Sequence, residues 1–264
     1  MDTRGILRPD EVGRAFELER PPVAADLGRV VGSHWAVTWS LPPGVTQRSE
    51  VLTHPAVHLV AEPDGVFVYG VHRELYVRVL EGEGFAVGSR FRAGGFGELV
   101  DFAVQQLTDR HVPAHEVFGP AGAELTERAA GARTTAGRAA VLEVFVRERL
   151  PAQPSAEAAL VRAVVDDIAT APPGTTVAAL AGRHGVSTRT LQRLFARHVG
   201  VGPKWVLRRL RLHDALDGLG RDGQPDWARF ALELGYFDHA HFIRDFRAVV
   251  GRSPAAYARE AAAA

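Results

Sequence analysis

Two stretches in the last third of the chain carry side chains that can hydrogen-bond to the edges of DNA bases. In the first, Arg189, Gln192 and Arg193 have the spacing that places residues on one face of a helix. In the second, the outward face carries a histidine and two arginines, His239, Arg244 and Arg247. Arginine can pair bidentately with guanine, and glutamine with adenine, from a helix in the major groove. The pattern therefore predicts two base-reading helices, at residues 188–198 and 239–248.

Other arginines nearby are better placed to contact phosphate groups, which position a protein on DNA without reading its sequence. They are Arg197, Arg208, Arg209 and Arg211. The chain has 31 basic and 31 acidic residues, but residues 172–264 hold 14 basic against 8 acidic, and residues 1–171 hold 17 against 23. A basic rear segment predicts a polyanionic partner. A solvated arginine-rich bundle is the alternative that composition alone leaves open.

The two helices belong to two copies of one sequence pattern. Leu191-Gln-Arg-Leu-Phe195 aligns with Phe242-Ile-Arg-Asp-Phe246, at an offset of 51 residues. Each copy reads as a short helix, a glycine turn, a capping residue and a second helix. Ser187 and Asp238 are the expected caps, because their side-chain oxygens can accept a free backbone N–H of the helix that follows. This order predicts two helix-turn-helix units.

Longer motifs surround both copies. Gly185–Phe195 and Gly200–Pro203 are followed by the similar stretches Gly235–Arg247 and Gly251–Pro254. Together they resemble the DNA-binding domain of AraC/XylS-type transcriptional regulators, over residues 175–259. The resemblance implies that a long helix over Lys204–Leu219 joins the two units and sets their recognition helices about one DNA turn (~34 Å) apart.

The second unit departs from the usual pattern of that family. Trp227 and Phe230 stand where smaller aliphatic residues are common. Gln224-Pro225-Asp226 still reads as a turn and cap, so we expect the fold to persist. Ala240 and Ile243 offer no hydrogen bonds, which predicts weaker base reading there or contacts with thymine methyl groups.

Residues 30–100 have the features of β-structure. Val66-Phe-Val-Tyr69 is β-branched and aromatic, and turn formers recur at short intervals, which favours a sandwich or barrel. Gly88–Phe96 resembles part of the cupin-like effector domain that precedes the DNA-binding module in related regulators. From about Pro120 onward helical patterns dominate, with helices expected over Ala139–Leu150 and Ala156–Ile168.

The predicted fold class is α+β. A cupin-like β-barrel or sandwich is followed by linker helices and by an all-α domain with two helix-turn-helix units. We expect an effector-sensing domain at residues 1–131, a helical linker at 132–171 and the DNA-binding domain at 172–264. The linker helices could form a dimer seam or pack on the barrel, so the sequence leaves monomer and homodimer open.

No catalytic or metal site is expected. The chain has no cysteine, which excludes thiolate chemistry and an alkyl-transferring repair activity. The histidine pairs His54/His58 and His111/His115 lack the spacing of a cupin metal site, so surface or barrel histidines are the simpler interpretation. The glycines between Gly82 and Gly97 are interpreted as hairpin turns. Six aromatic residues could line an effector pocket or form ordinary core, namely Trp35, Trp39, Phe67, Tyr69, Tyr76 and Phe91.

These observations predict a sequence-specific, DNA-binding transcriptional regulator that is not an enzyme and needs no cofactor. Its expected partners are double-stranded promoter DNA, an unknown small-molecule effector and, as a further candidate, RNA polymerase. With neither a signal peptide nor a bilayer-spanning stretch, a cytoplasmic location without membrane contact is expected. The alternative is a cupin-type enzyme or ligand-binding protein whose basic tail serves assembly.

Overall fold

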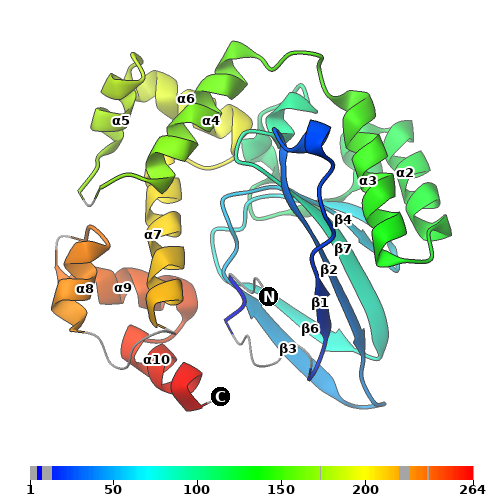
Figure 1. Ribbon diagram of the computed structural model, residues 1–264, viewed down its shortest axis with the longest axis horizontal. Helices are drawn as coiled ribbons and strands as arrows, with labels where there is room; N and C mark the ends of the chain where they lie inside the picture. The colour runs from blue at the N-terminus through cyan, green and yellow to red at the C-terminus, as the bar shows by residue number, and fades with distance from the viewer. Residues whose placement is uncertain (1–4, 8–13, 173, 220–225, 237, 264) are drawn as a thin grey trace.

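The N-terminal half contains two antiparallel sheets. A computed structural model of the chain describes residues 5–7, 14–172, 174–219, 226–236 and 238–263 (Figure 1). The strands are β1 (Glu17–Glu19), β2 (Val31–Ser40), β3 (Thr46–Val51), β4 (His58–Glu62), β5 (Gly65–Tyr69), β6 (Tyr76–Glu81), β7 (Glu83–Phe91) and β8 (His111–Pro113). Six of them form one sheet in the order β1-β2-β7-β4-β5-β8, and β3 pairs with β6 in the other.

The larger sheet has two different faces because side chains alternate along each strand. In β7, Val87 and Phe91 point to a face that is buried against helices, whereas Ala86 and Arg90 point to a cavity between the two sheets. The same alternation in β2 turns Trp35 toward the cavity. One sheet thus holds a helix-covered core on one side and a ligand-sized space on the other.

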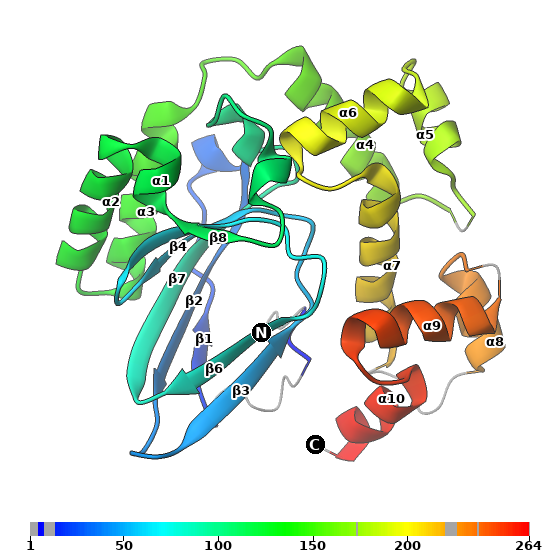
Figure 2. The same ribbon diagram turned by 180° about the vertical axis from the view of Figure 1, so that it is seen from behind.

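Three helices follow β8 and cover the core face, as Figures 1 and 2 show for α2 and α3. They are α1 (Ala114–Phe118), α2 (Pro120–Gly131) and α3 (Thr135–Arg149). Leu142, Phe145 and Val146 of α3 are at most 2% exposed within this core. Glu143 of α3 also lies 2.9 Å from the buried His34 Nε2 and accepts the backbone N–H of Ala24. The helix is therefore fixed to the sheet by both apolar and polar contacts.

The remaining helices form two groups joined by one long helix. They are α4 (Ala156–Ala169), α5 (Val177–Arg183), α6 (Thr188–His198), α7 (Pro203–Leu219), α8 (Trp227–Glu233), α9 (His239–Val250) and α10 (Pro254–Ala263). Figures 1 and 2 show α7 running from the group of α4, α5 and α6 to the group of α8, α9 and α10. Each group has its own apolar core, with Phe195 buried in the first and Phe246 in the second.

The predicted α+β class is confirmed. The helix expected at residues 188–198 has those bounds, and the one at 239–248 continues to Val250. The connecting helix begins at Pro203, one residue before the predicted start at Lys204, because proline is favoured at the first position of a helix. The predicted turn at Gln224-Pro225, and Phe237 within the second motif, lie outside the described residues.

The two helices predicted in the linker divide between the two halves of the molecule. Val146 of α3 packs in the core of the sheet, whereas Val161, Val164 and Ile168 of α4 pack with α5 and α6. These apolar side chains are thus buried within the chain itself. The structure gives them an intramolecular role, and no dimer seam is needed to explain their pattern.

Candidate DNA interface and ligand cavity

The first candidate recognition helix, α6, begins as its sequence predicts. Gly185 adopts a positive φ of 67°, a conformation in which side chains are strained, and this turns the chain between α5 and α6. The Ser187 hydroxyl then accepts the backbone N–H of Thr190 and caps the helix. Leu191 and Phe195 are fully buried, so the opposite face is turned outward. That face carries Arg189, Gln192 and Arg193, all three of them exposed.

The second candidate recognition helix, α9, is built in the same way. Gly235 has a φ of 76°, and the Asp238 carboxylate accepts the backbone N–H of His241 at 2.6 Å. Phe242 and Phe246 are fully buried. On the other side, Arg244 and Arg247 are exposed and His239 is half-buried. The two helices thus present cationic faces at corresponding positions.

Two of the predicted DNA-contacting arginines pair with carboxylates on neighbouring helices. Arg193 of α6 lies 3.1 Å from Glu157 of α4, and Arg208 of α7 donates through Nε to Asp245 of α9 at 2.8 Å. Arg193 and the neighbouring His198 together lower the pKa of Glu157, with the hydrogen bond from His198 as the largest cause. Both arginine side chains remain largely exposed, so the pairs restrain these cations without burying them.

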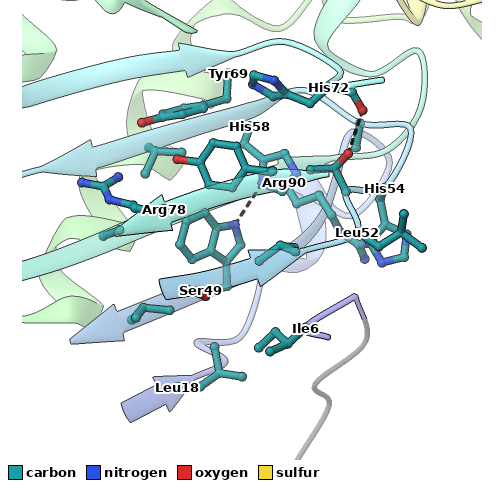
Figure 3. Close-up of a pocket in the computed structure, with 18 of the residues that line it drawn as sticks. Ile6, Leu18, Ser49, Leu52, His54, His58, Tyr69, His72, Arg78 and Arg90 are labelled. Atoms are coloured by element: carbon teal, nitrogen blue, oxygen red, sulfur yellow. Dashed lines mark hydrogen bonds between the residues drawn. The ribbon is translucent and has the colours of Figure 1, made fainter. Parts of the chain in front are cut away.

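A cavity of about 260 Å³ lies between the two sheets of the N-terminal half (Figure 3). Its floor is formed by two tryptophans of β2, each lying against a glycine of β7. Trp35 is the cross-strand partner of Gly88, and Trp39 is that of Gly84. A Cβ at Gly88 would come within 2.3 Å of the Trp35 ring, and one at Gly84 within 2.2 Å of the Trp39 ring. Glycine at both positions is therefore what allows the indoles to lie flat on the sheet.

Polar groups gather at two places in this cavity. His58 of β4 is the cross-strand partner of both Arg90 and Tyr69, so the three side chains share the cavity face. Glu62 accepts hydrogen bonds from Arg78 (2.5 Å) and from the Tyr69 hydroxyl (2.8 Å). Figure 3 shows Arg78 at one end of the cavity and Arg90 toward the other, near His54.

His58 is held as a neutral imidazole with a fixed tautomer. The Trp35 indole N–H donates to His58 Nδ1 at 3.0 Å, so the ring proton of His58 is on Nε2. Burial, followed by the positive charge of Arg90 and then by His72 and Arg20, lowers the pKa of His58 to about 3. The pKa of His72 is also lowered, mainly by burial. Both histidines are thus uncharged at neutral pH.

Comparison with known proteins decides the nature of the C-terminal half. A family model described as a helix-turn-helix domain matches residues 180–260. This stretch is an AraC-type DNA-binding domain. The chain is accordingly a DNA-binding transcriptional regulator, and the prediction from its motifs is confirmed. A second family model, a domain of unknown function (DUF6597), matches residues 19–113, which include both sheets. No curated protein matches the chain.

Solved structures similar to the chain include regulators of transcription. The C-terminal domain of AraT, a response regulator from Geobacillus stearothermophilus, is 24% identical, with 40% of this chain and 88% of that chain covered at a TM-score of 0.38. A DNA-binding transcriptional dual regulator from Escherichia coli K-12 is also 24% identical, with 43% and 98% covered and a TM-score of 0.34. ToxT from Vibrio cholerae O395 is 8% identical, with 93% and 98% covered and a TM-score of 0.39.

The AraC-type domain docks on the N-terminal half at the end of α6. Arg197 donates to the backbone carbonyls of Val100 and Phe102, and the Thr108 hydroxyl donates to the carbonyl of Gly200 at 2.7 Å. The structure thus places Arg197 at an interface between the two halves, not on the exposed face of α6. Its predicted phosphate contact would require the two halves to separate, and it stays a prediction.

A second docking contact lies along α7. Arg209 is only 2% exposed, and its guanidinium donates to the carbonyls of Thr53 (3.3 Å) and Arg73 (2.5 Å). The predicted phosphate contact of Arg209 is therefore wrong in this arrangement, because burial removes it from solvent. Arg211 is half-buried and donates to the carbonyl of Gly235 within the AraC-type domain. Of the four arginines predicted to bind phosphate, Arg208 is the exposed one.

The cavity also settles several sequence interpretations. Four of the six candidate aromatics line it, namely Trp35, Trp39, Tyr69 and Tyr76. Phe91 belongs to the core at 1% exposure, and Phe67 packs edge-on against His111. The interpretation of the glycine run as turns is wrong for Gly84 and Gly88, which lie inside β7.

The histidine pairs divide in the structure. His54 and His58 line the cavity, whereas His111 stacks on Tyr69 with ring centroids 5.1 Å apart. Throughout the described part of the chain, no group of three or more histidine, aspartate or glutamate side chains is arranged to hold a metal ion.

Among the described helices, none has the length and hydropathy that crossing a membrane requires. The sequence does not predict the arginines of the cavity, because it is the register of β4 against β7 that brings Arg90 beside His58.

Proposed function

We propose that the protein regulates promoters in the cytoplasm by placing α6 and α9 in two successive major grooves, under the control of a small molecule in the cavity. The observation that carries this proposal is the pair of capped helices with exposed cationic faces at the two ends of α7. A helix of 17 residues is about 25 Å long, which is close to the ~34 Å of one DNA turn once the width of the flanking helices is added.

The proposed base contacts are those of the two exposed faces. Arg189, Gln192 and Arg193 would read the first groove, with His239 and Arg244 in the second. Arg208 and Arg247 would contact phosphate groups. Each bidentate base contact is expected to contribute about 1–3 kcal/mol of discrimination.

Selection of bound fragments from genomic DNA at physiological salt tests this function. The wild type should enrich a motif with two elements one helical turn apart, and the double variant Arg193→Ala/Arg244→Ala should lose it. Arg208→Ala should instead weaken binding to all sequences and reduce its salt dependence. Salt-sensitive binding without any motif would reduce the AraC-type domain to a general DNA anchor and refute the proposal.

The proposed control by a ligand is supported by the place where α7 docks. Thr53 and His54 both line the cavity, and both contact α7: the Thr53 carbonyl through Arg209, and His54 through a ring stack with His213 at 4.0 Å. A ligand that moves this segment would shift the helix that spaces the two recognition helices. Binding to the N-terminal half would thereby change the affinity for DNA.

A further inference from the structure

We infer that α9 recognises thymine through its methyl group, and that Ala240 and Ile243 are the residues that determine this specificity. The inference rests on the proposed function, which places α9 in a major groove. It adds the chemistry of the bases that are read there. Where α6 offers hydrogen bonds to base edges, α9 offers two apolar side chains beside its arginines.

The internal repeat shows how the two recognition helices differ. At the offset of 51 residues that aligns the two units, Arg193 of α6 corresponds to Arg244 of α9, so both helices keep one arginine. Two further positions pair a hydrogen-bonding residue of α6 with an apolar residue of α9, namely Arg189 with Ala240 and Gln192 with Ile243. Side chains of alanine and isoleucine have neither a donor nor an acceptor, so the two helices cannot read bases by the same contacts.

The structure turns the apolar residues of α9 away from its core. Helical spacing places four residues on one face, namely Ala240, Ile243, Arg244 and Arg247. Ala240 and both arginines are exposed, and Ile243 is half-buried. Among the described residues, the apolar core beneath α9 takes in Phe242, Phe246 and Val249, whereas Ile243 is not packed against it. The Ile243 side chain thus lies on the face whose two cations attract DNA.

Thymine is the base whose edge fits such a face. In the major groove it presents a C5 methyl group, whereas cytosine presents an amino donor there and the purines present polar atoms. An isoleucine laid against one of those polar atoms would remove water from it without replacing the hydrogen bond, which costs free energy. Against the thymine methyl, the same side chain buries apolar surface on both partners. The apolar positions of α9 therefore select thymine.

Ala240 lies where a recognition helix comes close to the bases. Asp238 caps α9, so Ala240 stands in its first turn, and residues near the N-terminus of a recognition helix contact base edges. The small side chain of Ala240 leaves room for the helix to enter the groove and for Ile243, nearly one turn further on, to reach a base. Arg244 can read guanine from the same face. The DNA element under α9 is therefore expected to hold thymines beside a guanine.

The test replaces single thymines by deoxyuridine in the DNA fragment that the full-length wild type selects. Uracil keeps the base pairing and the O4 acceptor of thymine and lacks only the methyl group. The element under α9 is identified as the one that Arg244→Ala no longer selects. In that element, each contacted methyl that is removed should weaken binding about fourfold, measured by fluorescence anisotropy at constant salt. No loss at any thymine of that element would overturn the inference, as would equal losses in the element under α6, which would assign the effect to DNA shape.

A variant identifies the side chain that meets the methyl. Ile243→Ala should bind the thymine duplex more weakly than wild type does, and it should lose most of the fourfold preference for thymine over uracil at one position. Arg247→Ala is the matched control on the same face, because loss of a phosphate contact should weaken binding to both duplexes equally and leave the preference intact. An equal loss for both duplexes in Ile243→Ala would indicate a damaged helix and refute the methyl contact. The deoxyuridine measurements on wild type do not depend on how this variant folds.

Failure of the inference and failure of the proposed function give different results. A selected motif with two elements, but without sensitivity to uracil, would refute methyl reading and leave the proposed function in place. If no motif were selected at all, base reading by both helices would be refuted, and the inference with it.

Discussion

Arg209 and Thr53 are 156 residues apart in the chain, yet the Arg209 guanidinium donates to the Thr53 carbonyl oxygen across the boundary between the two halves. His213, one helical turn further along α7, contacts the same oxygen at 3.2 Å. Burial lowers the pKa of Arg209 to about 10, which still leaves the guanidinium charged at neutral pH. The Trp205 ring lies beneath it at 4.5 Å. The buried guanidinium is thus held by carbonyl oxygens of the N-terminal half and by an aromatic ring of its own helix.

Replacing Arg209 by methionine should loosen α7 from the rim of the cavity. The side chain keeps much of its volume, but the Arg73 carbonyl loses a buried partner, at a cost of about 1–3 kcal/mol. Hydrogen exchange should then become faster at the backbone amides of residues 205–213 and 50–54. Arg208→Met is the matched control, because Arg208 pairs with Asp245 on another side of α7. Similar exchange in the two variants would show that Arg209 does not hold the halves together.

The sequence predicts the helices of the AraC-type domain well because their determinants are local. Ser187 and Asp238 cap helices that begin at the next residue, and the apolar spacing gives the buried face. It does not predict what approaches a helix from elsewhere in the chain. Arg197 and Arg208 look equivalent in sequence, but one meets carbonyls of the N-terminal half and the other remains exposed. The cavity is hidden for the same reason, since its floor depends on which glycine of β7 lies opposite Trp35.

Glu157→Gln should modestly strengthen DNA binding. In the structure, Arg193 must leave its ion pair with Glu157 before it can contact a base. The pair is largely exposed, and such pairs contribute about 0.2–1 kcal/mol, so the gain in affinity should not exceed about fivefold. Binding of the selected DNA fragment, measured by fluorescence anisotropy, checks the change. In an Arg193→Ala background the same substitution should have no effect; a gain there would assign it to general electrostatics instead.

Gly88→Ala should disrupt the cavity floor. The new methyl group would lie within 2.3 Å of the Trp35 ring, so the indole must leave its place on the sheet. Overpacking of this kind costs about 1–3 kcal/mol of unfolding free energy. Gly182→Ala is the contrasting control, because a Cβ there meets nothing within 4 Å and alanine is favoured inside a helix. Urea denaturation should show a loss for the first variant and no loss for the second. Unchanged stability and an unchanged tryptophan emission spectrum in Gly88→Ala would contradict the described floor.

His58 should make the protein less stable as the pH falls below 6.5. Its pKa is about 3 in the folded protein and about 6.5 in the unfolded chain, so the unfolded chain takes up the proton first. This stabilisation is complete above pH 6.5 and declines as the pH falls toward the folded-state pKa, by about 1.4 kcal/mol per pH unit for one proton.

His58→Gln retains an acceptor for the Trp35 indole but cannot titrate. Between pH 7.5 and 5.5, wild type should therefore lose about 1 kcal/mol more than His58→Gln in urea denaturation. His198, whose pKa is also lowered by burial, lies on α6 away from the cavity, so its contribution is the same in both proteins and cancels in the difference. Parallel pH profiles for the two proteins would mean that His58 is not held neutral by its neighbours.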